Sequence, residues 1–136
     1  MKHEKIKFKG YVIINNKYRF DNIVCNKFYE MVADFFVGTS PDKLSHLAIG
    51  TGLNTATVTD IALQTEVIRV PFTTTASVGS QIHVQVIVDG STAIFNWKEL
   101  GLFNAAVAGD MTNRVNIDYV HNAGELVTID WYIEKV

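Results

Sequence analysis

The stretch Phe95-Asn-Trp-Lys-Glu-Leu-Gly-Leu-Phe-Asn104 is the most apolar and aromatic strand-like segment of the sequence, and it contains an acid, Glu99. Side chains of a β-strand alternate between its two faces. One face would then carry Phe95, Trp97, Glu99, Gly101 and Phe103, and the other Asn96, Lys98, Leu100 and Leu102. A carboxylate among aromatic side chains is costly unless it is hydrogen-bonded or paired. Glu99 therefore requires a partner.

Two arginines, Arg69 and Arg114, lie beside apolar strand residues and are the candidate partners. Either guanidinium could form a bidentate pair with Glu99 or with Glu66. Such pairs in apolar sheets usually fix strand register rather than catalyse a reaction. We therefore interpret these four residues as structural ion pairs, and the sequence leaves open which arginine faces Glu99.

The segments that follow Glu66 predict antiparallel strand pairs. Residues 66–72 alternate as a strand, and Pro71 indicates an edge or a strand end. Asp89-Gly90 favours a tight turn that pairs residues 82–88 with residues 94–103. A second pair is predicted between residues 113–120 and 125–134. The last strand should direct one set of side chains inward (Val127, Ile129, Trp131, Ile133) and another outward (Thr128, Asp130, Tyr132, Glu134).

The amino-terminal part predicts a hairpin and then a helix. Residues 5–14 and 17–20 alternate as strands around a turn at Asn15-Asn16, with Ile6 and Phe8 directed inward. From Asn26 the apolar spacing becomes helical, and Gly38 is placed to end the helix. The apolar stripe, which we expect to pack on the sheet, consists of Phe28, Met31, Val32, Phe35 and Phe36.

Gly50-Thr-Gly52 follows a predicted buried strand and is interpreted as a turn, in which glycine permits torsions that other residues resist. It lacks the third glycine of a dinucleotide fingerprint and the lysine of a P-loop. After a Thr-rich loop, Asp60 is predicted to cap one or two helical turns that run through Thr65.

Together these segments predict one mainly β domain: an antiparallel β-sandwich with one amphipathic helix near the amino terminus. With 136 residues, 48% hydrophobic and 19% charged, the chain has the composition of a folded globular protein. The expected divisions are a basic strand or arm (1–20), the helix (26–37) and the sandwich (44–136).

Charge is unevenly distributed along the chain. Residues 1–20 hold six basic side chains against one acid, whereas the rest of the chain is acidic. The localised lysines Lys5, Lys7 and Lys9 are candidates for docking onto an anionic surface, and the alternative is an edge strand whose lysines block aggregation. An acidic remainder argues against nucleic-acid binding, and no run approaches the length of a membrane span.

Catalytic, metal and cofactor motifs are not found in the sequence. The histidines His3, His46, His83 and His121 have no paired spacing, and Cys25 is the single cysteine, so an intrachain disulfide is excluded. No nucleophile-elbow pattern accompanies the many serines and threonines. We therefore expect no enzymatic activity and no cofactor.

Five segments in order resemble small virion proteins of tailed bacteriophages. They are Leu47-Ala-Ile-Gly-Thr-Gly52, Asp60-Ile-Ala-Leu-Gln-Thr-Glu66 with Arg69, Trp97-Lys-Glu-Leu-Gly-Leu-Phe103, Gly109-Asp-Met111 with Arg114, and Gly124-Glu-Leu-Val-Thr-Ile-Asp-Trp131. The third segment also resembles one in the amino-terminal module of phage tail-collar fibres. The resemblance implies a non-enzymatic structural protein of the virion, made in the host cytoplasm. It would be a self-associating capsid decoration or adaptor protein, for which the resemblance suggests a trimer, or else a tail, baseplate or fibre-attachment component.

Aromatic residues outside the predicted core are candidates for contacts between copies, because aromatics are enriched in interface cores. The candidates are Phe72, Tyr119, Tyr132 and the threonines 73–75. The alternative from another functional class is a carbohydrate-binding β-sandwich, in which Trp97, Trp131 or Tyr132 stacks on sugars. The predicted inward direction of both tryptophans argues against it.

Overall fold

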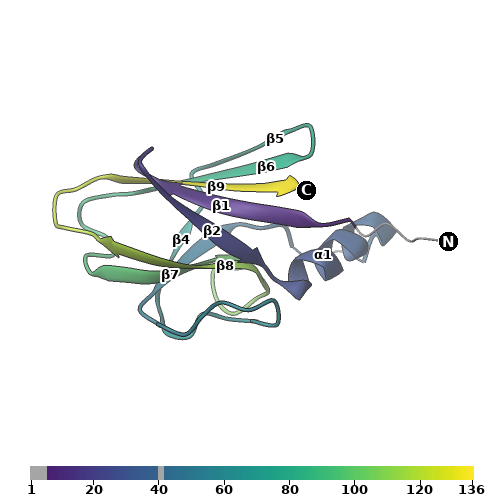
Figure 1. Cartoon of the computed structure of the whole chain (residues 1–136), viewed down its shortest axis with the longest axis horizontal. Coiled ribbons are helices and arrows are strands. Elements are labelled where there is room, and N and C mark those ends of the chain that lie inside the picture. Colours follow the sequence, from purple (N-terminus) through teal and green to yellow (C-terminus); the bar gives the residue numbers. More distant parts are fainter. Residues whose placement is uncertain (1–5, 40–41) are drawn as a thin grey trace.

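The computed structural model describes residues 6–39 and 42–136, and in this part of the chain it contains nine antiparallel strands and one helix (Figure 1). The strands are β1 (Phe8–Ile14), β2 (Tyr18–Val24), β3 (His46–Gly50), β4 (Glu66–Pro71), β5 (Thr74–Val78), β6 (Gln81–Val88), β7 (Asn96–Phe103), β8 (Met111–Val120) and β9 (Val127–Lys135), and the helix is α1 (Asn26–Val37).

All nine strands belong to one continuous sheet with the order β4-β3-β7-β8-β2-β1-β9-β6-β5. The sheet curls into a half-barrel, so that β4, β3, β7 and β8 face β1, β9, β6 and β5 (Figure 1). The expected sandwich of two separate sheets is not confirmed. Strand β2 joins the two halves, because it pairs with β1 along its length and with β8 through Ile23 and Val24.

Strands that follow each other in the sequence pair as four hairpins, β1–β2, β3–β4, β5–β6 and β7–β8. Strand β9 lies between β1 and β6. The predicted pairing of residues 82–88 with 94–103, and of 113–120 with 125–134, is therefore wrong. The turns at Asp89-Gly90 and at residues 121–124 do reverse the chain, but they carry it across the core to the opposite half. A turn signal shows that the chain reverses and does not specify which strand becomes the neighbour.

The first hairpin and the helix form as their sequences predict. Asn15 and Asn16 make the turn with φ of 54° each, and Gly38 ends the helix in the left-handed conformation with φ of 75°. The apolar stripe, however, packs only in part. Phe28 and Met31 are buried, whereas Phe35 is half exposed and Phe36 is 87% exposed. The reason is that the carboxyl-terminal part of α1 extends beyond the end of the sheet (Figure 1).

Strand β1 is an interior strand, paired on both sides by β2 and β9. The interpretation of the lysines near it as protection for a sheet edge is therefore wrong for the described residues, and Lys5 lies outside them. Phe8 packs against Phe28 of α1, with ring centroids 5.1 Å apart, while Ile6 is exposed. The Nζ atom of Lys9 lies 3.5 Å from the Glu134 carboxylate of β9.

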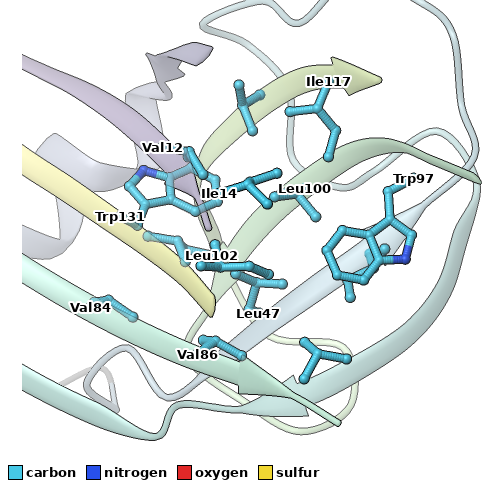
Figure 2. Close-up of a cluster of buried hydrophobic side chains, with 14 of the residues drawn as sticks. Val12, Ile14, Leu47, Val84, Val86, Trp97, Leu100, Leu102, Ile117 and Trp131 are labelled. Atoms are coloured by element: carbon cyan, nitrogen blue, oxygen red, sulfur yellow. The ribbon is translucent and has the colours of Figure 1, made fainter. Parts of the chain in front are cut away.

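The core fills the space between the two halves of the sheet (Figure 2). Strand β9 contributes the four side chains that its alternation predicts to point inward, and both Trp97 and Trp131 are fully buried. One residue of the predicted outward set, Asp130, is also buried. It accepts hydrogen bonds on Oδ1 from His83, at 2.7 Å, and from Gln85, at 3.1 Å.

Trp97 and Glu99 do not share one face of β7, although they are two residues apart. The register between β7 and β8 shifts between these two positions, from Trp97 opposite Tyr119 to Glu99 opposite Asn116. As a result Trp97 belongs to the main core with Leu100 and Leu102, and Glu99 points to the other side of the sheet. A local irregularity of this kind resets the alternation on which a period-two prediction depends.

The two edge strands of the sheet, β4 and β5, are connected by only two residues, Phe72 and Thr73. The backbone N–H of Phe72 donates to Ser45 O at 2.9 Å, and that of Thr73 donates to Gln85 O at 2.8 Å. The connection is thus bonded to both halves of the sheet. Because Pro71 and Thr74 are three Cα–Cα steps apart, a span of at most about 11 Å, the sheet must curl until the linked ends of its two edge strands are neighbours.

We expect Ile129→Ala to lower the free energy of unfolding by about 2–5 kcal/mol, because it opens a cavity in the centre of the core. The control is Ile87→Ala on the adjacent strand, whose side chain is 42% exposed and whose truncation should cost less than about 1 kcal/mol. Urea denaturation of both variants measures the difference. Equal destabilisation by the two substitutions would contradict this assignment of the core.

Candidate functional site: a buried carboxylate beneath the 51–65 loop

Residues 51–65, here called the cover loop, connect β3 to β4 and lie over the outer face of β7 and β8. The helical turns predicted after Asp60 do not form. Instead the Asp60 carboxylate accepts hydrogen bonds from the amide of Thr57 at 2.8 Å and from its hydroxyl at 2.9 Å. Asp60 therefore stabilises a tight turn in the middle of the loop.

Glu99 lies beneath the cover loop with no solvent exposure and binds both of its ends. Its Oε2 accepts hydrogen bonds from the backbone amides of Gly52, at 2.6 Å, and Thr65, at 2.8 Å. Its Oε1 accepts one from the amide of Gln64 at 2.8 Å. Hydrogen bonds to an ionised acceptor are stronger than neutral ones. The carboxylate thus holds the two ends of the loop together, through its second residue and its last two.

Arg114 is the arginine that faces Glu99. Its Nη2 and Nε atoms lie 3.0 Å and 3.3 Å from Glu99 Oε1, and its side chain is 1% exposed. The same guanidinium reaches the middle of the cover loop, where Nη1 donates to Asp60 Oδ2 at 2.9 Å and Nη2 donates to Asn54 O at 3.0 Å. We call Glu99, Arg114, Asp60 and Asn54, with the three amides, the Glu99 cluster.

The two glycines of Gly50-Thr-Gly52 are required by close approach and not by unusual torsions, since neither has a positive φ. A Cβ atom would lie 2.7 Å from Glu99 Oε2 at Gly50 and 2.4 Å from it at Gly52. The torsional explanation expected from the sequence is therefore wrong. Any side chain at these positions would push the backbone away from the carboxylate.

The electrostatics of the Glu99 cluster favour the ionised form of Asp60. Partial burial acts to raise the pKa of Asp60, but hydrogen bonds from Thr57 and Arg114 outweigh it and hold the pKa below its usual 3.8. Both oxygens of Glu99 are occupied by donors and neither reaches solvent. A carboxylate in this position is suited to holding the loop and not to proton transfer with a bound substrate.

Arg69 pairs with Glu66 and not with Glu99. Its Nε and Nη2 atoms lie 2.9 Å and 2.6 Å from the two oxygens of Glu66, in a bidentate arrangement. Its Nη1 donates to the backbone oxygens of Ala105, at 3.0 Å, and Ala108, at 2.6 Å, and the guanidinium lies 3.7 Å from the ring centroid of Phe103. Arg69 therefore fixes the connection between β7 and β8.

The aromatic residues expected at an interface lie in different parts of the molecule. Phe72 is half buried in the connection between the sheet edges. Tyr119, near the end of β8, contacts Glu125 and accepts a hydrogen bond from Asn15 on its hydroxyl, and burial together with Glu125 raises its pKa to about 12. Tyr132 lies on the outer face of β9, where burial and nearby Asp130 raise its pKa.

Tyr132 is part of a stack of four side chains that no pattern in the sequence indicates. The Arg19 guanidinium lies 4.0 Å from the Tyr11 ring, Tyr11 stacks on Tyr132 at 5.0 Å, and Tyr132 stacks on His83 at 4.4 Å. The members come from four adjacent strands, so both faces of the Tyr132 ring are occupied. Only the strand register, which the sequence does not give, could have brought them together.

Cys25 is buried next to the cover loop, where its thiol faces Thr57 O at 3.9 Å. Burial and the charge of Asp60 raise the pKa of this thiol to about 11. Among the described residues, no group of three or more His, Cys, Asp and Glu side chains is placed to hold a metal ion. None of the helices in the described part of the chain is long and apolar enough to span a membrane.

No protein-family model, curated protein or solved structure matches this chain. The relation to phage virion proteins stays a prediction from the five sequence segments. Four of them contribute residues that meet around the cover loop: Gly52, the 64–69 segment, Glu99 and Arg114. These segments therefore share a structural task.

We expect Glu99→Ala to destabilise the protein by about 3–5 kcal/mol, because it leaves the Arg114 guanidinium buried without its partner. The rate at which Cys25 reacts with a thiol reagent reports opening of the cover loop and should rise in the same variant. Asp118→Ala, which removes the exposed partner of Lys98, should cost about 1 kcal/mol or less and leave that rate unchanged. An unaltered melt and labelling rate for Glu99→Ala would contradict this role.

The lowered pKa of Asp60 predicts a contribution to stability that depends on pH. Because the folded-state pKa lies below the unfolded value near 3.8, the contribution is complete above that pH and is lost as the pH falls through the folded-state pKa. The free energy of unfolding should therefore fall more steeply below pH 3.8 in the wild type than in Asp60→Asn. Asp118→Asn, which removes an exposed carboxylate, controls for net charge. If the free energy of unfolding depends on pH in the same way in the wild type and in Asp60→Asn, Asp60 makes no such contribution.

Proposed function

We propose that this chain is a non-enzymatic structural protein of a bacteriophage virion, which binds other virion proteins and copies of itself. The observation that carries the proposal is the use of the Glu99 cluster. Its buried charges and amides are saturated by one another, and their contacts hold a loop in place. In this protein the buried polar groups fix the conformation of a surface loop. A surface of fixed conformation is suited to binding another protein.

The outer surface of the cover loop supports a docking role. Leu53 and Ile61 are 76% and 77% exposed, and Val58 is half exposed, although the backbone of the loop is fixed by the contacts described above. Three exposed apolar side chains on one loop whose backbone is held in place offer apolar surface to a partner protein. We therefore propose the cover loop as the surface that binds the virion.

The resemblance favours a capsid decoration or adaptor protein that occupies a lattice in many copies. A tail, baseplate or fibre-attachment component is the alternative. The lysines Lys7 and Lys9 are exposed at the start of β1, so they remain candidates for contact with an acidic surface of the particle. Both versions require that the protein binds an assembled part of the virion.

A carbohydrate-binding function is less well supported. Sugar-binding aromatics need one exposed ring face, and both tryptophans are fully buried. Tyr132, the third candidate, is stacked between Tyr11 and His83 and offers neither face.

The test combines light scattering of the purified protein with binding to empty capsids and to isolated tails of the phage that encodes it. We expect co-sedimentation with capsids, and Leu53→Asp should reduce it at least about tenfold, because a charge would enter an apolar contact. Leu126→Asp, at a leucine that is 62% exposed and lies outside the cover loop, is the control. Binding to tails alone would favour the alternative location, and binding to neither would refute the proposal.

A further inference from the structure

The longest run of the sequence without Asp, Glu, Lys or Arg is residues 70–88. In the structure this run covers the end of β4, the connection at Phe72 and Thr73, and the whole β5–β6 hairpin. It therefore includes one entire edge of the sheet. Natural proteins usually protect such edges with charged side chains, proline or a covering segment.

Strand β5 carries no charged side chain and no proline, and no other described strand pairs with its free side. It pairs with β6 alone, and all five of its residues, Thr74 to Val78, are exposed. On its free side an edge strand presents unpaired backbone N–H and C=O groups that another strand can bind. The side chains are small or β-branched and uncharged, so they do not obstruct the approach of a second strand.

The opposite edge, β4, is protected. Pro71 lacks a backbone N–H, and β4 carries Glu66 and Arg69, which form an ion pair on this strand. One edge of the sheet is thus protected against pairing with another strand, and the other edge is not. This contrast indicates that the exposure of β5 serves binding.

We propose that β5 of one copy pairs antiparallel with β5 of a second copy across a two-fold axis at Ala76. A two-fold interface places residues next to their own counterparts, so a charged residue near the axis would repel itself. Residues 70–88 meet this condition, because they include no Asp, Glu, Lys or Arg. With the axis at Ala76, Thr74 lies opposite Val78 of the second copy, and Thr75 lies opposite its Ser77, which are pairs that fit a sheet.

The pairing joins two nine-stranded sheets into one. This inference rests on the self-association in the proposed function and specifies its surface. A contact of five residues per strand is small, so we expect a dimer that forms only at high concentration in solution. On a lattice with many copies, the high local concentration makes the same contact effective.

Cysteine cross-linking tests the register. In Ala76→Cys the two new thiols lie opposite each other, and mild oxidation should convert the protein to a covalent dimer. Native Cys25 is buried and does not interfere. Val67→Cys, an exposed position on the protected β4 edge, is the matched control and should remain monomeric. No cross-linking of Ala76→Cys, or equal cross-linking of both variants, would overturn the proposal.

A second variant tests the interaction without a covalent bond. Ala76→Lys places two like charges at the axis and should raise the concentration needed for dimer formation about tenfold or more by light scattering, whereas Val67→Lys should not. Circular dichroism shows whether both variants keep the fold. If the wild type is a trimer and the Ala76→Cys variant does not cross-link, the β5 pairing is overturned. If the wild type nevertheless binds capsids or tails, the proposed virion function still stands.

Discussion

The burial of one carboxylate, Glu99, organises an entire side of this molecule. Removing a carboxylate from water is tolerated only where donors replace the water, and here three loop amides and Arg114 do so. The apolar counterpart is Leu63, which packs into a small second core with Cys25, Phe103 and Met111. Gly101 makes room for it, since a Cβ there would lie 3.0 Å from Leu63. Polar and apolar contacts thus fix the same loop.

The curl of the sheet has a separate cause in the connectivity. The chain forms four hairpins, and after every second strand it crosses from one half of the sheet to the other, with α1 included in the crossing after β2. The two-residue link at Phe72 and Thr73 is the shortest of these crossings. It brings the edges together without closing the barrel, since the link bonds to Ser45 and Gln85. The core forms inside the resulting half-barrel.

Local patterns predicted part of the local structure of this protein, although the helical turns expected after Asp60 do not form. The sequence predicted the turn at Asn15-Asn16, the helix that begins at Asn26 and the inward residues of the last strand, because each depends on residues that are close in the sequence. The sequence also predicted that Glu99 needs a partner, but it did not predict that the partner is Arg114 and not Arg69. That choice depends on the pairing of β7 with β8, which involves a register shift between Trp97 and Glu99 that no periodicity reveals. Asn54, and the contact of Asp60 with Arg114, were not predicted because loop polar residues carry no signal of what they contact.

The position of β9 has a consequence for how the polypeptide acquires its shape during synthesis. The strand that comes after all the others in sequence lies between β1 and β6, which are among the earlier ones. Until residues 127–135 have left the ribosome, β1 and β6 each lack a neighbour, and the half of the sheet that contains them cannot assemble. Such non-local pairing makes folding slow relative to a chain of local hairpins. The nascent chain therefore carries several ready hairpins but reaches its native sheet only after translation of the final strand is complete.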